Sequence, residues 1–190
     1  LAEKAMVEGL PKINTNGTVC EVCMKGKQIR EKIPKKSLWR ATQRLELVHS
    51  DICGPISPTS ESGKRYIINF IDEFSRKCWS FFLAEKSEAL RTFKEFKNAA
   101  ERESGELLVC LRTDRGGEYN SKAFQDYCVE HGIKRQLTAA YTPQQNGVAE
   151  RKNRSILNMV RCMLFGMKVP IKYWTEATQY AVHILNLSLI

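Results

Sequence analysis

The sequence predicts an α/β protein built on a mixed β-sheet, and three observations lead to this prediction. Short apolar runs separated by turn residues come first, and segments with apolar residues at helical spacing then alternate with further short runs. The chain has 190 residues, of which 43% are hydrophobic and 27% charged, as in an ordinary soluble globular protein with one core. No apolar run approaches the roughly 20 residues of a membrane span, so an integral membrane protein is not expected.

The first part of the sheet is expected to be an antiparallel meander of three strands. The turn sequences between the strands are short and rich in Gly, Pro, Ser and Asp, which suits tight connections. The second strand is the most apolar of the three and is expected to be central and buried. The predicted strands span residues 45–52, 66–71 and 78–83.

The hydrophobic period then changes to that of helices. Ser87 with Glu88 predicts a helix start, and Gly105 predicts its end. A second helix is expected from about Ser121 to Gly132, which supplies a C-cap. The remaining predicted segments are a strand at 107–111, a polar turn at 112–119, a fifth strand at 133–137, a loop at 143–147, a long helix closed by Gly166 and Pro170, and a last helix over 174–185.

Three acidic residues occupy positions where the chain would bring carboxylates together. Asp51 ends the first strand, Asp114 follows the fourth, and Glu150 lies in the first turn of the long helix. If the first and fourth strands are neighbours, both aspartates emerge at one edge of the sheet, within reach of the glutamate. Each acid also has an ordinary structural explanation, because Asp favours turns and Glu favours the first turn of a helix. Spacing alone does not exclude other acids, such as Asp72 or Glu118.

Such a group of carboxylates has a chemical consequence. Neighbouring carboxylates raise each other's pKa unless a cation neutralises them. Oxygen ligands favour the hard cations Mg²⁺ and Mn²⁺, and two such ions about 3.5–4 Å apart can hold both oxygens of a phosphoryl displacement. The three acids therefore predict a site for one or two divalent metal ions.

Positive charge is concentrated in two parts of the chain. The net charge is +9: residues 1–50 carry +5, residues 51–113 are neutral and residues 114–190 carry +4. Within residues 25–44, eight basic side chains face only Glu31. This pattern predicts a polyanionic partner such as DNA, although a solvated linker would have the same composition.

The seven cysteines fall into two groups. Five scattered cysteines are interpreted as small hydrophobic residues of a reducing compartment, which places the protein inside the cell. They are Cys53, Cys78, Cys110, Cys128 and Cys162. Cys20 and Cys23 instead form a Cys-x-x-Cys pair in a polar stretch, the spacing at which two thiolates bind one zinc ion. Because no histidine precedes Cys20, this is half of a zinc site.

Several ordered motifs make residues 45–186 resemble the integrase core of copia-type long-terminal-repeat retrotransposon polyproteins. The motifs are His-Ser-Asp-Ile-Cys-Gly-Pro (49–55), Phe-Ile-Asp-Glu-Phe-Ser-Arg (70–76), Leu-Arg-Thr-Asp-Arg-Gly-Gly-Glu-Tyr (111–119) and Thr-Pro-Gln-Gln-Asn-Gly-Val-Ala-Glu-Arg-Lys-Asn-Arg (142–154). The family's acidic triad corresponds to Asp51, Asp114 and Glu150, and thirty-five residues (115–149) separate the last two.

The resemblance implies a ribonuclease H-like fold, a mixed five-stranded sheet flanked by helices and preceded by a partial zinc-binding segment. It implies polynucleotidyl transfer, meaning 3′-end processing of element DNA and strand transfer into target DNA, with two Mg²⁺ or Mn²⁺ ions at the triad. It also implies a homo-oligomer when active, nuclear action, and a division of the chain at residue 40. Residues 1–40 would be the remnant of a His-His-Cys-Cys zinc module with a basic linker, and residues 41–190 the catalytic core with its C-terminal helices.

The zinc ligands follow from the same resemblance, whereas the DNA contacts are expected from the polar and basic side chains around the triad. The missing histidines would precede residue 1, so Zn²⁺ is expected only in a longer parent chain, and the sequence is interpreted as a fragment. Glu150, Arg154 and Arg161 share one stripe of the long helix. The predicted DNA-binding residues are Gln144, Gln145, Asn146, Arg151, Lys152, Arg154 and Arg161. The polar loop at 144–146 could equally be a plain entry turn of the long helix.

Two alternatives remain open at this point. One is a catalytically inactive transposon relic that folds and only binds nucleic acid. The other is a different ribonuclease H-like nuclease, for example one that cuts RNA in hybrids, since one fold hosts several activities. The spacing of the triad and the Pro-Gln-Gln-Asn-Gly loop favour the integrase over the nuclease.

Overall fold

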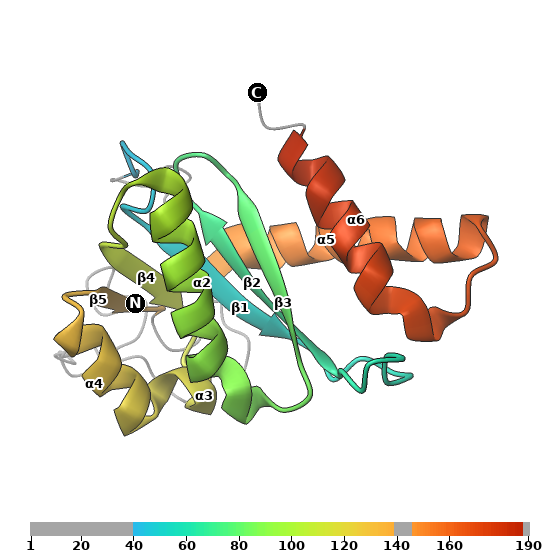
Figure 1. The fold of residues 1–190 in the computed structure, drawn as a ribbon, viewed down its shortest axis with the longest axis horizontal. Helices are drawn as coiled ribbons and strands as arrows, with labels where there is room; N and C mark the ends of the chain where they lie inside the picture. Colours follow the sequence, from blue (N-terminus) through green and yellow to red (C-terminus); the bar gives the residue numbers. More distant parts are fainter. Residues whose placement is uncertain (1–39, 139–145, 188–190) are drawn as a thin grey trace, which may run out of the picture. The chain divides into compact units, whose positions relative to one another are not determined.

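The centre of the protein is a five-stranded mixed sheet with the strand order β3-β2-β1-β4-β5 (Figure 1). A computed structural model describes residues 40–138 and 146–187. The first three strands pair antiparallel, whereas β4 pairs parallel with β1 and β5 parallel with β4. The expected meander of three strands joined to two more is therefore confirmed.

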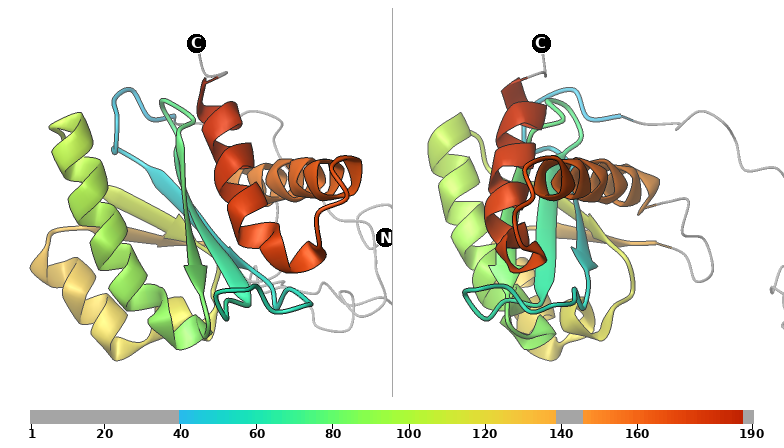
Figure 2. Two further views of the ribbon diagram at one scale, coloured as in Figure 1. Left: turned by 45° about the vertical axis from the view of Figure 1, so that its right-hand side comes forward. Right: turned by 90° about the vertical axis from the view of Figure 1, so that its right-hand side faces the viewer.

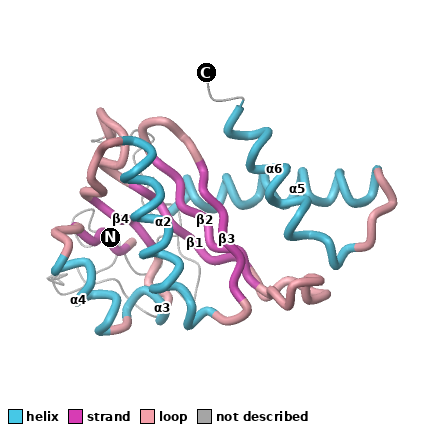
Figure 3. Tube along the Cα trace, in the orientation of Figure 1, coloured by secondary structure: helices cyan, strands magenta, loops and turns pink. Residues whose placement is uncertain are grey.

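The elements alternate along the chain as the periodicity predicts. The strands are β1 (Val48–Cys53), β2 (Tyr66–Asp72), β3 (Cys78–Leu83), β4 (Cys110–Thr113) and β5 (Lys134–Leu137). The helices are η1 (Lys86–Glu88), α2 (Ala89–Ser104), α3 (Gly117–Asn120), α4 (Lys122–Glu130), α5 (Gly147–Gly166), η3 (Ile171–Tyr173) and α6 (Trp174–Leu187). Figure 3 shows this alternation along the chain trace.

Helices cover both faces of the sheet and create two apolar cores (Figure 2). On one face, α2, α3 and α4 pack against the strands around Phe70, Phe93 and Phe124. The rings of Phe70 and Phe96 stack with their centroids 4.1 Å apart. On the other face, α5 and α6 pack against Ile67 and Ile71. The central strand β2 is thus covered on both faces, which explains why it is almost wholly buried.

Local sequence signals explain several of the helix ends. Gly105 ends α2 in the left-handed conformation, with φ 75°, which glycine adopts without steric cost. The hydroxyl of Ser121 accepts a hydrogen bond from the Phe124 amide and caps α4. Both boundaries were expected from the sequence and are confirmed.

Several expected boundaries were wrong in detail. The first strand was expected at 45–52 but spans Val48–Cys53, and the C-cap of α4 is His131, one residue before the expected Gly132. The fourth strand was expected at 107–111 but spans Cys110–Thr113, and the polar turn expected at 112–119 contains the short helix α3. Of the cysteines interpreted as small hydrophobic residues, Cys78, Cys110 and Cys128 are buried, Cys53 is half-buried and Cys162 is exposed. Within the described residues, no helix combines the length and the apolar character that crossing a bilayer requires.

Candidate active site

The sheet topology brings the two predicted aspartates to one place. Val48 pairs with Leu111 and His49 with Arg112 in the parallel β1–β4 ladder. The same register, continued by two residues, sets Asp51 level with Asp114, which directly follows β4. β1 and β4 are therefore adjacent strands, which is the condition under which the two aspartates were expected to lie close together.

The long helix α5 brings the third acid to the same region. Glu150 lies in its first turn and is exposed. Ala149 and Ile156 on the inward face of α5 are fully buried, and they fix the side of the helix that faces the sheet. A carboxylate in the first turn also interacts favourably with the helix dipole.

The pKa of Asp51 is affected by the two other acids. The pKa of its carboxyl is raised to about 6, first because the group is largely buried and then because of the negative charges of Asp114 and Glu150. Burial and like charges both disfavour the ionised form. A cation beside these groups would remove the repulsion, so their electrostatics suit a positively charged ligand.

A chain of buried side-chain amides holds Asp51 in position. Asn153 Nδ2 donates a hydrogen bond of 2.8 Å to Asp51 Oδ2. Asn69 Nδ2 in turn donates to Asn153 Oδ1 at 2.6 Å, and Ser80 Oγ donates to Asn69 Oδ1. The chain runs from β3 through β2 and α5 to the carboxylate on β1, so the orientation of Asp51 depends on three neighbouring elements.

The sequence analysis did not identify this amide chain, although it contained a signal. Asn69 interrupts the most apolar strand of the protein and is 1% exposed. A buried amide in a central strand must find hydrogen-bond partners on another element. Asn153, three residues after Glu150, supplies one of them.

The turn that carries Asp114 is fixed by its own hydrogen bonds. The Gly116 amide donates to Asp114 Oδ1 at 3.0 Å, and Arg115 Nε donates to the Thr138 carbonyl at 2.9 Å. The following short helix α3 is anchored by Tyr119, which is fully buried and shares a 2.8 Å hydrogen bond with the Ser50 hydroxyl. Tyr119 thereby ties α3 to β1 next to Asp51.

The carboxylates have the chemistry of a divalent-cation site but are not arranged as a closed set of ligands. All their donor atoms are oxygen, which suits Mg²⁺ or Mn²⁺. Among residues 40–138 and 146–187, however, no three His, Cys, Asp or Glu side chains lie in an arrangement that would hold a metal ion. Glu150 is exposed, whereas Asp51 and Asp114 are half-buried.

The predicted DNA-binding residues of α5 lie in three different environments. Arg151, Arg154 and Arg161 are exposed, and Lys152 is half-buried. Asn146 is buried, and its Nδ2 donates to the Ser50 carbonyl at 3.4 Å, so its side chain joins the start of α5 to β1. Residues Gln144 and Gln145, and the zinc-ligand candidates Cys20 and Cys23, lie outside the described residues.

Comparison with known proteins gives a consistent family signal. The model of the integrase core domain family matches residues 41–143. The chain is 42% identical over 188 residues to the retrovirus-related Pol polyprotein from transposon TNT 1-94 of Nicotiana tabacum, and 33% identical over 169 residues to that from transposon RE1 of Arabidopsis thaliana. These alignments cover 99% and 88% of this chain but only 14% and 11% of the polyproteins.

Solved structures share the fold. A chain of the simian T-cell lymphotropic virus intasome superimposes with a TM-score of 0.64 and 20% identity, covering 86% of this chain and 55% of that chain. The catalytic core domain of the HTLV-2 integrase, solved with magnesium in a trimeric form, gives a TM-score of 0.56 and 20% identity, covering 75% and 86%. The ribonuclease H-like fold expected from the sequence is therefore confirmed.

Proposed function

Because the chain belongs to the integrase core domain family, we propose that it is the catalytic core of a retrotransposon integrase that carries out metal-dependent polynucleotidyl transfer. The proposed reaction has two steps. The oxygen of a water molecule first attacks a phosphodiester near the end of the element DNA and releases a 3′-hydroxyl. That hydroxyl then attacks a phosphodiester of target DNA, and the bond to the leaving 3′-oxygen breaks.

One observation carries the proposal: the parallel register of β1 and β4 sets Asp51 level with Asp114, and Asn153, three residues after Glu150 on α5, donates a hydrogen bond to Asp51. We assign all three as catalytic metal-binding residues. Bound Mg²⁺ or Mn²⁺ ions would polarise the phosphoryl oxygen and lower the pKa of water. The HTLV-2 integrase core was solved in complex with magnesium, which supports this choice of metal.

The other residues of the site orient the acids and the DNA. The Asn153 amide donates to Asp51 Oδ2, and the Gly116 amide donates to Asp114 Oδ1. Arg154 lies one turn after Glu150 and is exposed, as a contact to a DNA phosphate requires. We also propose that Arg151, Lys152 and Arg161, with Gln144 and Gln145, line the DNA path. Asn146, also predicted as a DNA contact, is buried and instead holds the start of α5 on β1.

Several properties of the whole protein belong to the same proposal. The chain spans 14% of the TNT 1-94 polyprotein, so a longer parent would carry the remaining parts of the zinc module that includes Cys20 and Cys23. Integration into chromosomal DNA would take place in the nucleus. The intasome and the trimeric core among the similar structures support a homo-oligomer as the active form.

The experiment that tests the proposal is a disintegration or strand-transfer assay on branched DNA with Mn²⁺. Wild type is compared with Asp114→Asn and with a matched control, Asp126→Asn, which removes an exposed acid on α4. We expect the wild type and the control to cut and join DNA only with metal, and Asp114→Asn to lose activity.

The alternative is a relic that binds nucleic acid without catalysis. DNA binding by a folded but inactive wild-type chain would support the relic. The assay is then repeated on a longer chain that includes the proposed histidine ligands of the zinc module. Activity of the longer chain would mean that the core needs this module, whereas continued inactivity would mean that the catalytic site itself is inactive. Activity that survives Asp114→Asn would refute the assignment of the triad.

A further inference from the structure

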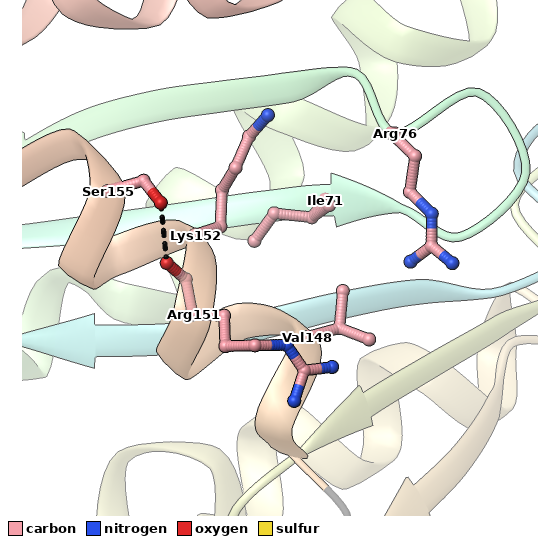
Figure 4. A pocket seen from close by; sticks show the side chains of 6 residues that line it. All are labelled: Ile71, Arg76, Val148, Arg151, Lys152 and Ser155. Atoms are coloured by element: carbon pink, nitrogen blue, oxygen red, sulfur yellow. Dashed lines mark hydrogen bonds between the residues drawn. The ribbon is translucent and has the colours of Figure 1, made fainter.

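A basic pocket lies beside the N-terminal half of α5. It has a volume of about 400 Å³ and is bounded by the β2–β3 turn on one side and by α5 on the other. In Figure 4, the cationic ends of Arg76, Arg151 and Lys152 surround the aliphatic side chains of Ile71 and Val148. Three positive charges from two separate elements therefore face one apolar floor.

The charges in this pocket are incompletely compensated. Arg151 and Lys152 form no ion pair with any carboxylate of the described residues. Arg76 Nη1 lies 3.2 Å from Glu73 Oε2, and that oxygen also lies 2.6 Å from His49 Nε2. Two of the five guanidinium donors of Arg76 point to Glu73, so others remain available.

The ammonium group of Lys152 belongs to a half-buried side chain, and Arg76 lines the same pocket. A buried lysine is normally paired with a negative group, because an uncompensated charge away from water is costly. An anion between Arg76 and Lys152 would stabilise both.

The pocket and the acidic site lie on opposite flanks of the same helix. Successive residues of an α-helix are rotated by about 100°. Lys152 and Val148 consequently lie on the flank opposite that of Glu150 and Arg154, and the exposed Arg151 lies on the crest between them. The two flanks are separated by about 10 Å, the width of a helix with its side chains.

We propose that Arg76, Arg151 and Lys152 form a second phosphate-contact site, which holds a phosphodiester of the same DNA whose reacting phosphate lies at the acidic triad. The inference rests on the proposed function and adds to it a defined path for the DNA, across α5 from the flank of Glu150 to the β2–β3 turn. Arg76 is thereby assigned to DNA binding, a role that the sequence motifs did not indicate.

The composition of the pocket favours a nucleic-acid backbone over a free phosphate ion. A free ion needs donors around most of its oxygens, whereas the floor formed by Ile71 and Val148 supplies none. A backbone presents a phosphate flanked by sugars, whose carbon atoms can rest on such a floor. The pocket is also open to the surface, so a continuous strand can enter and leave it.

The test measures binding of a short fluorescent DNA duplex as a function of salt, with the whole 190-residue chain. The double variant Arg151→Gln/Lys152→Gln removes two of the proposed contacts. The matched control, Lys94→Gln/Arg102→Gln, removes the same charges from exposed positions on α2, on the opposite face of the sheet. Each lost phosphate contact lowers the salt slope by about 0.9.

We expect the pocket variant to bind DNA about tenfold more weakly at low salt than the wild type. The magnitude of the slope of log affinity against log salt concentration should fall by about 1 to 2, while the control changes little. Arg151→Lys/Lys152→Arg keeps the charges and should bind as the wild type does. If the glutamine variant does not fold, Lys152→Met is measured alone, since methionine fills the same half-buried space, and the slope should fall by about 0.9.

Two outcomes would overturn the proposal. The first is an equal loss of affinity in the pocket variant and the α2 control. It would mean that the pocket residues act only through the net charge of the protein and make no specific phosphate contact. The second is protection of the wild type, but not of the pocket variant, by inorganic phosphate against thermal unfolding, combined with unchanged DNA affinity. Failure of the proposed function itself is recognised separately, because the wild type would then lack the activity that depends on Mn²⁺ and Asp114.

Discussion

At the scale of single residues, Asn153 is the most informative position of the site. Its amide links Asp51 to Asn69, and groups that orient metal ligands affect metal binding by about 10–100-fold. We expect Asn153→Ala to lower activity by about this factor and to raise the Mn²⁺ concentration needed for half-maximal activity. Metal titrations of the strand-transfer rate check this.

The control for this prediction is Asn158→Ala, which removes an exposed amide from the same helix. Asn158 Oδ1 accepts a hydrogen bond of 2.7 Å from Arg161 Nη2, and its loss should leave the metal dependence unchanged. A merely structural role for Asn153 would lower the thermal stability without moving the metal requirement, and that result would contradict the positioning role.

Cysteine reactivity gives a second test at the residue scale. Burial raises the pKa of the Cys78 and Cys128 thiols to about 11, so at pH 8 only about one in a thousand of each is ionised. The exposed Cys162 should be alkylated by iodoacetamide well before either. As the pH rises from 8 to 10, the labelling of Cys78 and Cys128 should accelerate about tenfold per unit.

Mass spectrometry of the tryptic peptides follows each thiol separately. Protein unfolded in urea is the reference, in which the three cysteines should react at similar rates. Labelling of Cys78 or Cys128 in the folded protein at the rate of Cys162 would contradict the burial of these thiols.

At the scale of elements, the aromatic layer beneath α2 carries much of the stability. Phe93 is fully buried, stacks on Phe124 with the ring centroids 5.0 Å apart, and lies 5.9 Å from Phe70. Phe93→Ala should lower the free energy of unfolding by about 3–5 kcal/mol, because it leaves a cavity among these rings. Urea denaturation measures the change, and Arg102→Ala, on the exposed side of α2, should cost less than about 0.5 kcal/mol.

The errors in the sequence-based elements have a common physical cause. The run Leu107–Leu111 was expected as the fourth strand because it is apolar, yet Leu107 is 74% exposed. The strand is instead defined by its hydrogen-bond ladder, in which Arg112 and Thr113 pair with the polar strand β5. Pairing between distant segments leaves no periodic signal in the sequence, whereas an amphipathic helix such as α5 does.

The short helix α3 illustrates the same limit. Its residues, Gly117–Asn120, are mostly polar and resemble a turn. One buried tyrosine holds it, through the bond to Ser50 on β1 and the edge-on packing against Phe124. Tertiary contacts therefore decide its conformation.

At the scale of the whole molecule, the sequence predicted the acids more securely than their surroundings. Asp51, Asp114 and Glu150 occur in motifs, whereas the amides that orient Asp51 come from β2 and α5 and meet only in the fold. Arg76 reaches the pocket beside α5 from the β2–β3 turn, seventy-five residues before Arg151. Contacts of this kind become visible only when the sheet order and the position of α5 are known.

The net charge of +9 leads to a prediction about DNA binding by the entire chain. Residues 1–50 and 114–190 carry all of the excess, so several phosphates should be neutralised at once. With three or four such contacts, affinity should fall by roughly 40-fold or more between about 50 and 200 mM salt. Fluorescence anisotropy of a labelled duplex gives the slope, and heparin should displace the DNA whereas neutral dextran should not.

This measurement separates electrostatic binding from recognition at the acidic site. Counterion release depends on Lys and Arg and not on the triad, so Asp114→Asn should show the same steep slope as the wild type while lacking strand transfer. Removing one negative charge beside the DNA path should even tighten binding slightly when no metal is present. An affinity that stays flat over this range of salt, or equal displacement by dextran and heparin, would mean that the clustered positive charge does not contact a polyanion.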